Sequence, residues 1–224
     1  MENHQEISLL YDRKYECLYC GEKFTGKKIR QSKLMLDRRD PDYCCHYKQE
    51  SPYFYEVNVC PHCGFAYTDS FVPPNPAQRG ILKRTYLDKA GSLDLCGERS
   101  LVDAEKSYKL ALLCATLSDQ NGAIIAGLLM RLAWINRFAG KKEEEEKHLA
   151  KALSAYEFIY MNGDGTAQKM GKHQLLYLLG EISGRIGKMA EAKRWFSQLF
   201  LEKNIEPSLD KLARDRWQDF KGVS

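Results

Sequence analysis

Apolar residues recur every three or four positions along most of the chain, from about residue 78 onward. This spacing places them on one face of an α-helix, and turn residues divide the pattern into seven segments. The predicted helices cover residues 78–90, 101–118, 122–139, 142–160, 171–186, 189–203 and 208–220. The chain is therefore predicted to be mostly α-helical.

The first 71 residues show short alternations of apolar and polar positions in place of the helical period. Lys33–Arg38 alternates weakly and Tyr53–Val59 alternates clearly, as strands with one buried face do. The following stretch, Val72–Pro76, contains three prolines, which fix their own backbone dihedral and remove amide donors. We place a domain boundary there and predict an α+β protein: a small β domain at residues 1–75 and an antiparallel helical array at residues 76–224.

The helical part carries a repeat that fits the tetratricopeptide pattern, in which small residues let paired helices approach and large residues fill the space between them. The best copy consists of Leu176, Leu179, Gly180, Gly187, Ala192, Phe196 and Leu199. Repeats of this kind stack to form a core and leave a concave surface that commonly receives a peptide or a partner helix. We therefore expect a protein or peptide partner in a helical groove.

The predicted β domain contains two copies of one short motif, Cys-x-x-Cys-Gly. A turn of this kind lets two thiolates reach one ion, and the glycine takes a left-handed conformation that a side chain would resist. Four thiolates from two such turns make a closed tetrahedral shell, which suits structural zinc and leaves no position for substrate. The predicted metal ligands of this zinc-ribbon-like domain are Cys17, Cys20, Cys60 and Cys63.

Other uses of these cysteines are less well supported. Iron in the same cage is an alternative to zinc. A redox dithiol usually occurs once, within an α/β pattern that is missing here. Disulfides need an oxidising compartment, and the first residues, Met1–Glu6, have neither the basic flank nor the apolar stretch of a secretory signal, so we expect a cytoplasmic protein.

Cys44, Cys45 and His46 form a second group of potential ligands. They could supply an alternative metal ligand, a second metal site or a reactive thiol near the first site, although adjacent cysteines rarely converge on one ion. A zinc or thiol redox sensor that uses Cys44 or Cys45 is therefore an alternative function.

The charge of the chain argues against a nucleic-acid-binding domain. The formal net charge is +4, yet residues 1–75 carry 10 Lys or Arg against 11 Asp or Glu. Residues 23–39 are locally basic, with seven cationic side chains and the single acid Asp37. Because no aromatic residues alternate with these charges, we interpret them as a solvated face and keep nucleic-acid binding through residues 23–39 as an alternative.

Neither catalysis nor a membrane span is predicted. The sequence contains no His-Glu-x-x-His, no Gly-x-Ser-x-Gly and no phosphate-binding glycine loop, so we expect a protein without enzymatic activity. The longest apolar stretch, Gly122–Ile135, is interrupted by Arg131 and is too short to cross a bilayer.

The order of these features resembles a bacterial family of uncharacterised proteins, domain of unknown function 2225. The stretches that carry the resemblance are Cys17–Gly21, Phe54–Gly64, Gly97–Ser100, Ser107–Leu113, Leu132–Trp134, Leu178–Glu181 and Arg194–Phe196. The resemblance implies a bacterial cytoplasmic protein with a Cys-rich head and a tetratricopeptide-like tail, and it implies no activity. Together with the motifs, it favours a zinc-binding protein that acts as an interaction scaffold or adaptor.

Overall fold

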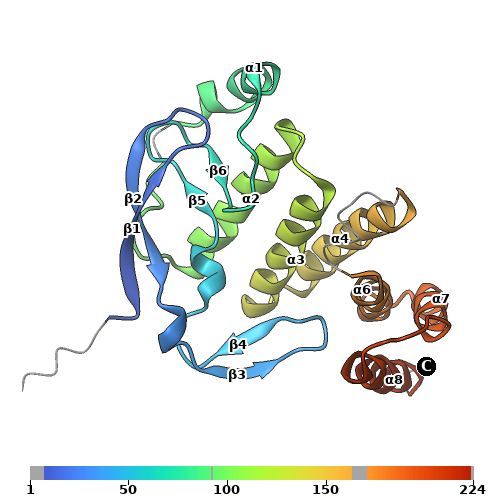
Figure 1. Cartoon of the computed structure of the whole chain (residues 1–224). Helices are drawn as coiled ribbons and strands as arrows, with labels where there is room; N and C mark the ends of the chain where they lie inside the picture. Colours follow the sequence, from blue (N-terminus) through green and yellow to red (C-terminus); the bar gives the residue numbers. More distant parts are fainter. Residues whose placement is uncertain (1–7, 92, 163–170, 223–224) are drawn as a thin grey trace, which may run out of the picture. The chain divides into compact units, whose positions relative to one another are not determined.

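The computed structural model describes residues 8–91, 93–162 and 171–222, which form two compact units (Figure 1). The first unit contains the described residues up to Arg38 together with Cys45–Gln120. The second unit contains Arg39–Cys44 and the described residues from Asn121 onward. The two helices that follow residue 75 thus belong, by their contacts, to the same unit as the cysteine motifs. The sequence pattern instead places a domain boundary at residue 75.

Three antiparallel two-stranded sheets lie in the first unit, apart from Arg39 at the end of one strand. Their strands, in paired order, are β1 (Leu10–Glu16) with β2 (Lys23–Ile29), β3 (Leu36–Arg39) with β4 (Cys45–Tyr47), and β5 (Asn58–Val59) with β6 (Ala66–Tyr67). In the first sheet Leu10 lies opposite Ile29 and Glu16 lies opposite Lys23. The β1–β2 and β5–β6 connections carry the two Cys-x-x-Cys-Gly motifs, so each motif closes a strand pair.

The strand predicted at Tyr53–Val59 is only partly correct. Pro52–Tyr55 forms a short 3₁₀ helix (η2), whose amide at Tyr53 donates to the Ser51 side chain, and the strand β5 covers only Asn58–Val59. The backbone carbonyls of Phe54 and Val57 accept hydrogen bonds from the guanidinium of Arg99. Because this buried arginine satisfies carbonyls that a strand partner would otherwise take, the alternating pattern does not become a longer strand. Further short 3₁₀ turns are η1 (Gln31–Lys33) and η3 (Leu87–Lys89).

Two helices complete the first unit. Helix α1 (Pro76–Thr85) begins with a capping box between Asn75 and Gln78, and α2 (Leu101–Leu117) begins with one between Ser100 and Asp103. Helix α2 packs against η2, β5 and β6 and buries Tyr108 completely. The first unit therefore has a mixed core between one helix and the strand pairs.

The second unit consists mainly of helices. They are α3 (Gly122–Phe138), α4 (Lys142–Asn162), α6 (Lys172–Arg185), α7 (Met189–Phe200) and α8 (Pro207–Lys221). Helix α3 packs against α4, α4 against α6, and α6 against both α7 and α8. Over the described residues, the seven α-helices correspond to the seven predicted segments, and the predicted class, mostly helical with small antiparallel strand pairs, is confirmed. None of the described helices is both long and apolar enough to cross a membrane.

Helices α6 and α7 form a hairpin in which a small residue lies directly against a large one. A Cβ atom at Gly180 would lie 2.9 Å from the ring of Phe196, so only glycine allows this approach of the two helices. Gly187 has a φ of 77° in the turn between them. The remaining members of the pattern, from Leu176 to Leu199, are buried.

A buried ionic cluster holds residues 39–44 within the second unit. The fully buried carboxylate of Asp42 accepts hydrogen bonds from both terminal nitrogens of Arg137, at 2.6 and 3.1 Å, and from the indole of Trp134 at 3.0 Å. Arg137 also pairs with Asp40 at 2.7 Å and with Glu145 at 2.8 Å. These bonds satisfy the buried charges and connect a short loop to α3 and α4.

Candidate metal centre

The two cysteine motifs have the same backbone hydrogen bonds. In the first motif the amide of Cys17 donates to the carbonyl of Glu22 at 3.0 Å, and the amide of Gly21 donates to the carbonyl of Cys17 at 2.9 Å. The equivalent bonds in the second motif are 3.0 Å, from Cys60 to Phe65, and 2.8 Å, from Gly64 to Cys60. We call these two turns, Cys17–Gly21 and Cys60–Gly64, knuckle 1 and knuckle 2.

Both glycines adopt the left-handed conformation that the motif predicts. The φ angles are 76° at Gly21 and 77° at Gly64. A residue with a side chain rarely adopts this conformation, whereas glycine adopts it without steric cost. The two knuckles therefore present their cysteines in the same way although they lie in different strand pairs.

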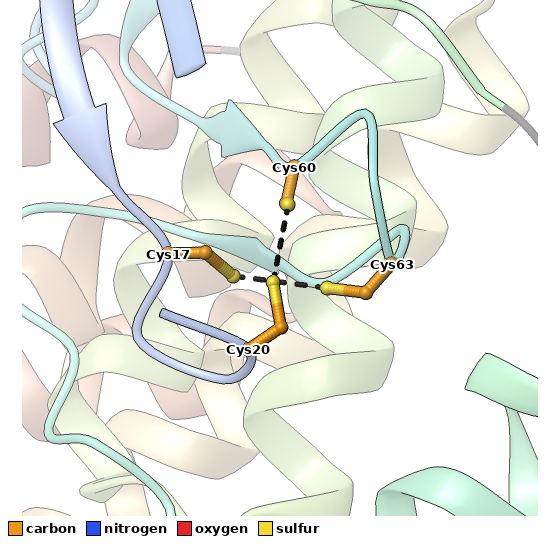
Figure 2. A group of neighbouring side chains, drawn as sticks. All are labelled: Cys17, Cys20, Cys60 and Cys63. Atoms are coloured by element: carbon orange, nitrogen blue, oxygen red, sulfur yellow. Dashed lines mark hydrogen bonds between the residues drawn. The ribbon is translucent and has the colours of Figure 1, made fainter. Parts of the chain in front are cut away.

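The four predicted ligands come together in the structure. Figure 2 shows the sulfur atoms of Cys17, Cys20, Cys60 and Cys63 pointing toward one another from the two knuckles. The Sγ atoms of Cys17 and Cys63 are 3.7 Å apart, as are those of Cys20 and Cys60, and all four atoms lie within 4.8 Å of one another. The group could therefore hold a metal ion.

The spacing of the sulfurs fits a tetrahedral thiolate shell. With metal–sulfur bonds of about 2.3 Å, the sulfurs of a regular tetrahedron lie about 3.8 Å apart. Two separations of 3.7 Å, each between one cysteine of knuckle 1 and one of knuckle 2, match this value. The donor set, four soft sulfurs, is also the one that zinc and iron prefer in closed sites.

Crowding of the four thiols separates their pKa values when no cation is considered. A hydrogen bond from Cys63 lowers the pKa of Cys17 to about 5. The same hydrogen bond raises the pKa of Cys63, and burial raises the pKa of Cys60 to about 12. Several thiolates this close together repel one another, so a bound cation would favour their ionised forms.

Packing also connects the two knuckles. The ring of Tyr19, in knuckle 1, stacks on that of Phe65, which follows knuckle 2, with 5.8 Å between ring centroids. The hydroxyl of Tyr67 on β6 donates to the carbonyl of Glu16 on β1 at 3.1 Å. Cys17 and Cys60 are buried, Cys63 is half-buried and Cys20 is exposed. One side of the sulfur group is therefore in the core of the unit and the other side is open to solvent.

The remaining cysteines lie outside the four-sulfur group. Cys44 is completely buried in the second unit, while Cys45 and His46 are half-buried on β4. Cys114 is buried on α2, and its sulfur accepts a hydrogen bond from the Ala66 amide at 3.4 Å. Cys96, in the first unit, is half-buried.

Comparison with known proteins places the chain in a family. The model of the family described as "Uncharacterized protein conserved in bacteria (DUF2225)" matches residues 10–220, almost the whole sequence. Neither the curated proteins nor the solved structures contain a significant match. The match covers the two knuckles and the helices of both units, and the chain accordingly belongs to this bacterial family, domain of unknown function 2225.

Proposed function

We propose that the protein binds one structural Zn²⁺ through Cys17, Cys20, Cys60 and Cys63 and acts without enzymatic activity as an adaptor for another protein. The observation that carries the proposal is the four-sulfur group, with Sγ separations of 3.7 Å across the two knuckles. A closed sulfur shell leaves no coordination position for a substrate, so the metal would stabilise the first unit and take no part in a reaction. Zinc is favoured over iron because structural sites of this type most commonly hold it.

Metal analysis of the purified chain tests the first half of this proposal. We expect about one zinc per chain by elemental analysis, and loss of the metal from a variant with Cys60→Ser and Cys63→Ser. Substitution with Co²⁺ should give the intense visible absorption of a tetrahedral thiolate site. Iron in place of zinc would correct the identity of the metal, and a metal-free native protein would overturn the proposal.

The helical unit supports the adaptor role. Its helices form two hairpins, α3 with α4 and α6 with α7. Phe158 and Met161 lie one turn apart on α4 and are 65% and 69% exposed, which is unusual for large apolar side chains near each other on one helix. We propose that this pair contacts an apolar segment of a partner protein.

Affinity capture with the metal-loaded chain tests the adaptor role. The double variant Phe158→Asp, Met161→Asp should lose a partner that the unchanged chain enriches. Leu201→Asp is the control, because Leu201 is also an exposed apolar residue but lies at the end of α7. If both variants retain the same partners, or if no partner is enriched, the α4 surface is not an adaptor surface.

The two alternative functions have less support in the structure. A sensor based on Cys44 needs an oxidant to reach a residue that is 0% exposed, and one based on Cys45 would use a half-buried thiol. Nucleic-acid binding through residues 23–39 needs free cations, yet Lys27 pairs with Asp12 at 2.8 Å and Lys28 lies 3.7 Å from Asp69. Opposing charges from Asp12 on β1 and from Asp69, which follows β6, reduce the attraction of this hairpin for phosphate.

A further inference from the structure

Arg79, on the second turn of α1, holds the backbone of knuckle 1. Its guanidinium donates to the carbonyl of Leu18 at 3.2 Å and also to the carbonyl of Tyr19, so it contacts both residues between Cys17 and Cys20. The guanidinium also lies over the ring of Tyr19, 5.2 Å from the ring centroid, which is within the range of about 6 Å for a cation–π contact. One side chain thus fixes the peptide groups that link the two cysteines of knuckle 1.

Tyr86, directly after α1, holds knuckle 2. Its hydroxyl donates to the carbonyl of Gly64 at 2.9 Å. A Cβ atom at Gly64 would lie 3.4 Å from this hydroxyl oxygen and 3.1 Å from the Cβ of Ala90, so the segment that follows α1 packs closely on the knuckle. Tyr86 is half-buried, and burial raises the pKa of its hydroxyl to about 12.

The two contacts come from one short segment of the chain. Arg79 and Tyr86 are seven residues apart, which corresponds to about 10 Å along a helix. Within this segment Leu82 is completely buried, and the capping box of Asn75 and Gln78 fixes the start of the helix. A rigid, anchored helix therefore contacts knuckle 1 at one end and knuckle 2 at the other.

We infer that Arg79 and Tyr86 are positioning residues for the metal centre, which hold the two knuckles at the separation that four-sulfur coordination requires. The inference rests on the proposed metal site and goes beyond it, because neither residue is a ligand. Outer residues that orient metal ligands commonly change metal affinity by 10- to 100-fold when they are replaced. Because the two equilibria are linked, bound metal stabilises the packing of α1 on the knuckles by the same free energy by which this packing strengthens metal binding.

Metal competition measurements on the full chain test this inference. We expect Zn²⁺ to bind about tenfold more weakly to Arg79→Met and several-fold more weakly to Tyr86→Phe, measured against a chromophoric chelator. Arg79→Lys retains the charge but not the planar fork of donors, so it should resemble Arg79→Met if hydrogen bonding to two carbonyls is the cause. Lys83→Met is the control, because Lys83 is an exposed cation one helical turn after Arg79.

The double variant Arg79→Met, Tyr86→Phe distinguishes a shared clamp from two local contacts. If one helix holds both knuckles, loss of either contact already frees the knuckles from their fixed separation. The double variant should then bind zinc only slightly more weakly than Arg79→Met alone. Effects that multiply would mean independent contacts and would contradict the clamp. Unchanged affinity in the single variants, with zinc bound normally by the unchanged chain, would overturn this inference alone.

Hydrogen exchange on the unchanged chain gives a second measurement that needs no substitution. Zinc should slow amide exchange in residues 79–86 as well as in the knuckles, because metal and docked helix stabilise each other. In Arg79→Met and Tyr86→Phe, zinc should protect the knuckles but no longer protect residues 79–86. Zinc that protects the knuckles of the unchanged chain without any effect on α1 would overturn the inference, whereas an unchanged chain that binds no metal would overturn the proposed function itself.

Discussion

The two units of this protein are stabilised by different means. The first unit has three sheets of two strands each, and its longest strands have seven residues. Pairs of strands this short are marginally stable on their own. The second unit has helices of 12 to 21 residues that bury large side chains against one another, among them Trp195 and Phe196.

Charge is also used differently in the two units. In the first unit the buried ionisable groups that converge are thiols, which need a cation before all four can be ionised. In the second unit the buried carboxylates of Asp42 and Glu181 already have arginine partners, Arg137 for Asp42 and Arg216 for Glu181. The second unit thus contains its own counter-charges, whereas the first, under the proposed metal binding, takes its counter-charge from solution.

The largest predicted effect is the loss of the metal centre. Cys60→Ser, or removal of the metal by a chelator, should unfold the first unit, because structural zinc sites contribute on the order of 10 kcal/mol and the whole stability of such a unit is of similar size. The three tryptophans, Trp134, Trp195 and Trp217, all belong to the second unit. Tryptophan emission should therefore stay native while amides of β1, β2 and α2 lose their protection from exchange.

Cys96→Ser is the matched control for this experiment. Cys96 is a half-buried cysteine of the same unit, outside the four-sulfur group, and its thiol lies 3.8 Å from the carbonyl of Val59. We expect it to cost less than about 1 kcal/mol, since serine retains a donor at this position. If chelation shifted the tryptophan emission to that of the unfolded chain, the two units would be one cooperative structure and the comparison would fail.

The second largest effect is expected from Asp42→Ala, which should destabilise the second unit by about 3 kcal/mol. Removing one partner of a buried ion pair leaves the other without compensation, at a typical cost of about 3–5 kcal/mol. Arg137 retains Asp40 and Glu145, which places the expected loss at the lower end. Urea unfolding followed by tryptophan emission measures this change.

Asp219→Asn serves as the control for that measurement. Its carboxylate also pairs with an arginine of the second unit, Arg216 at 2.8 Å, but its side chain is 64% exposed. Exposed pairs of this kind contribute about 0–1 kcal/mol. Equal losses in Asp42→Ala and Asp219→Asn would show that the buried cluster does not stabilise the helical unit.

The sequence predicts local features of this molecule well and distant contacts poorly. The helices are predicted within a few residues because their periodicity and caps are local, as at Ser100 and Asp103. The four converging cysteines are predictable because the two motifs are equal and each carries its own turn. By contrast, Asp42 lies in a short polar stretch that has the composition of a surface turn, and only the fold brings it to Arg137, 95 residues later.

The role of α1 is also invisible in the sequence. Prolines at residues 73, 74 and 76, the last of which begins the helix, indicate a boundary, and Arg79 resembles any exposed arginine on a helix. Its partners are backbone carbonyls 60 and 61 residues earlier in the chain. Every residue type has such a carbonyl, so the sequence cannot indicate these contacts. The same holds for the contact between Tyr86 and Gly64.

Alanine should be tolerated differently at the two knuckle glycines. At Gly21 it should cost less stability than Asp42→Ala does. Both substitutions force a side chain into the left-handed region, at a cost of about 1–2 kcal/mol. A Cβ atom at Gly21 would meet no atom within 4 Å, whereas one at Gly64 would press on Ala90 and Tyr86. We expect Gly64→Ala to be worse by about 1 kcal/mol and to weaken metal binding more, measured by urea unfolding of the zinc-loaded chain with tyrosine circular dichroism. Equal losses would mean that the segment after α1 yields to the added methyl group.

The smallest predicted effect is the response of the second unit to acid. Burial raises the pKa of Asp42, but hydrogen bonds and charge from Arg137, together with Arg185 and Trp134, outweigh burial and leave the pKa below its ordinary value. A carboxyl whose pKa is lower in the folded state stabilises the fold above its unfolded pKa of about 4, and this contribution is lost as the pH falls through the folded pKa. Asp42→Asn cannot lose a charge, so the stability of this variant should fall less steeply between about pH 5 and pH 3. The two slopes should differ by at most about 1.4 kcal/mol per pH unit.

Tryptophan emission isolates this effect from acid release of metal, because the first unit has no tryptophan. Parallel pH curves for the two chains would show that Asp42 is not the group through which acid weakens the helical unit.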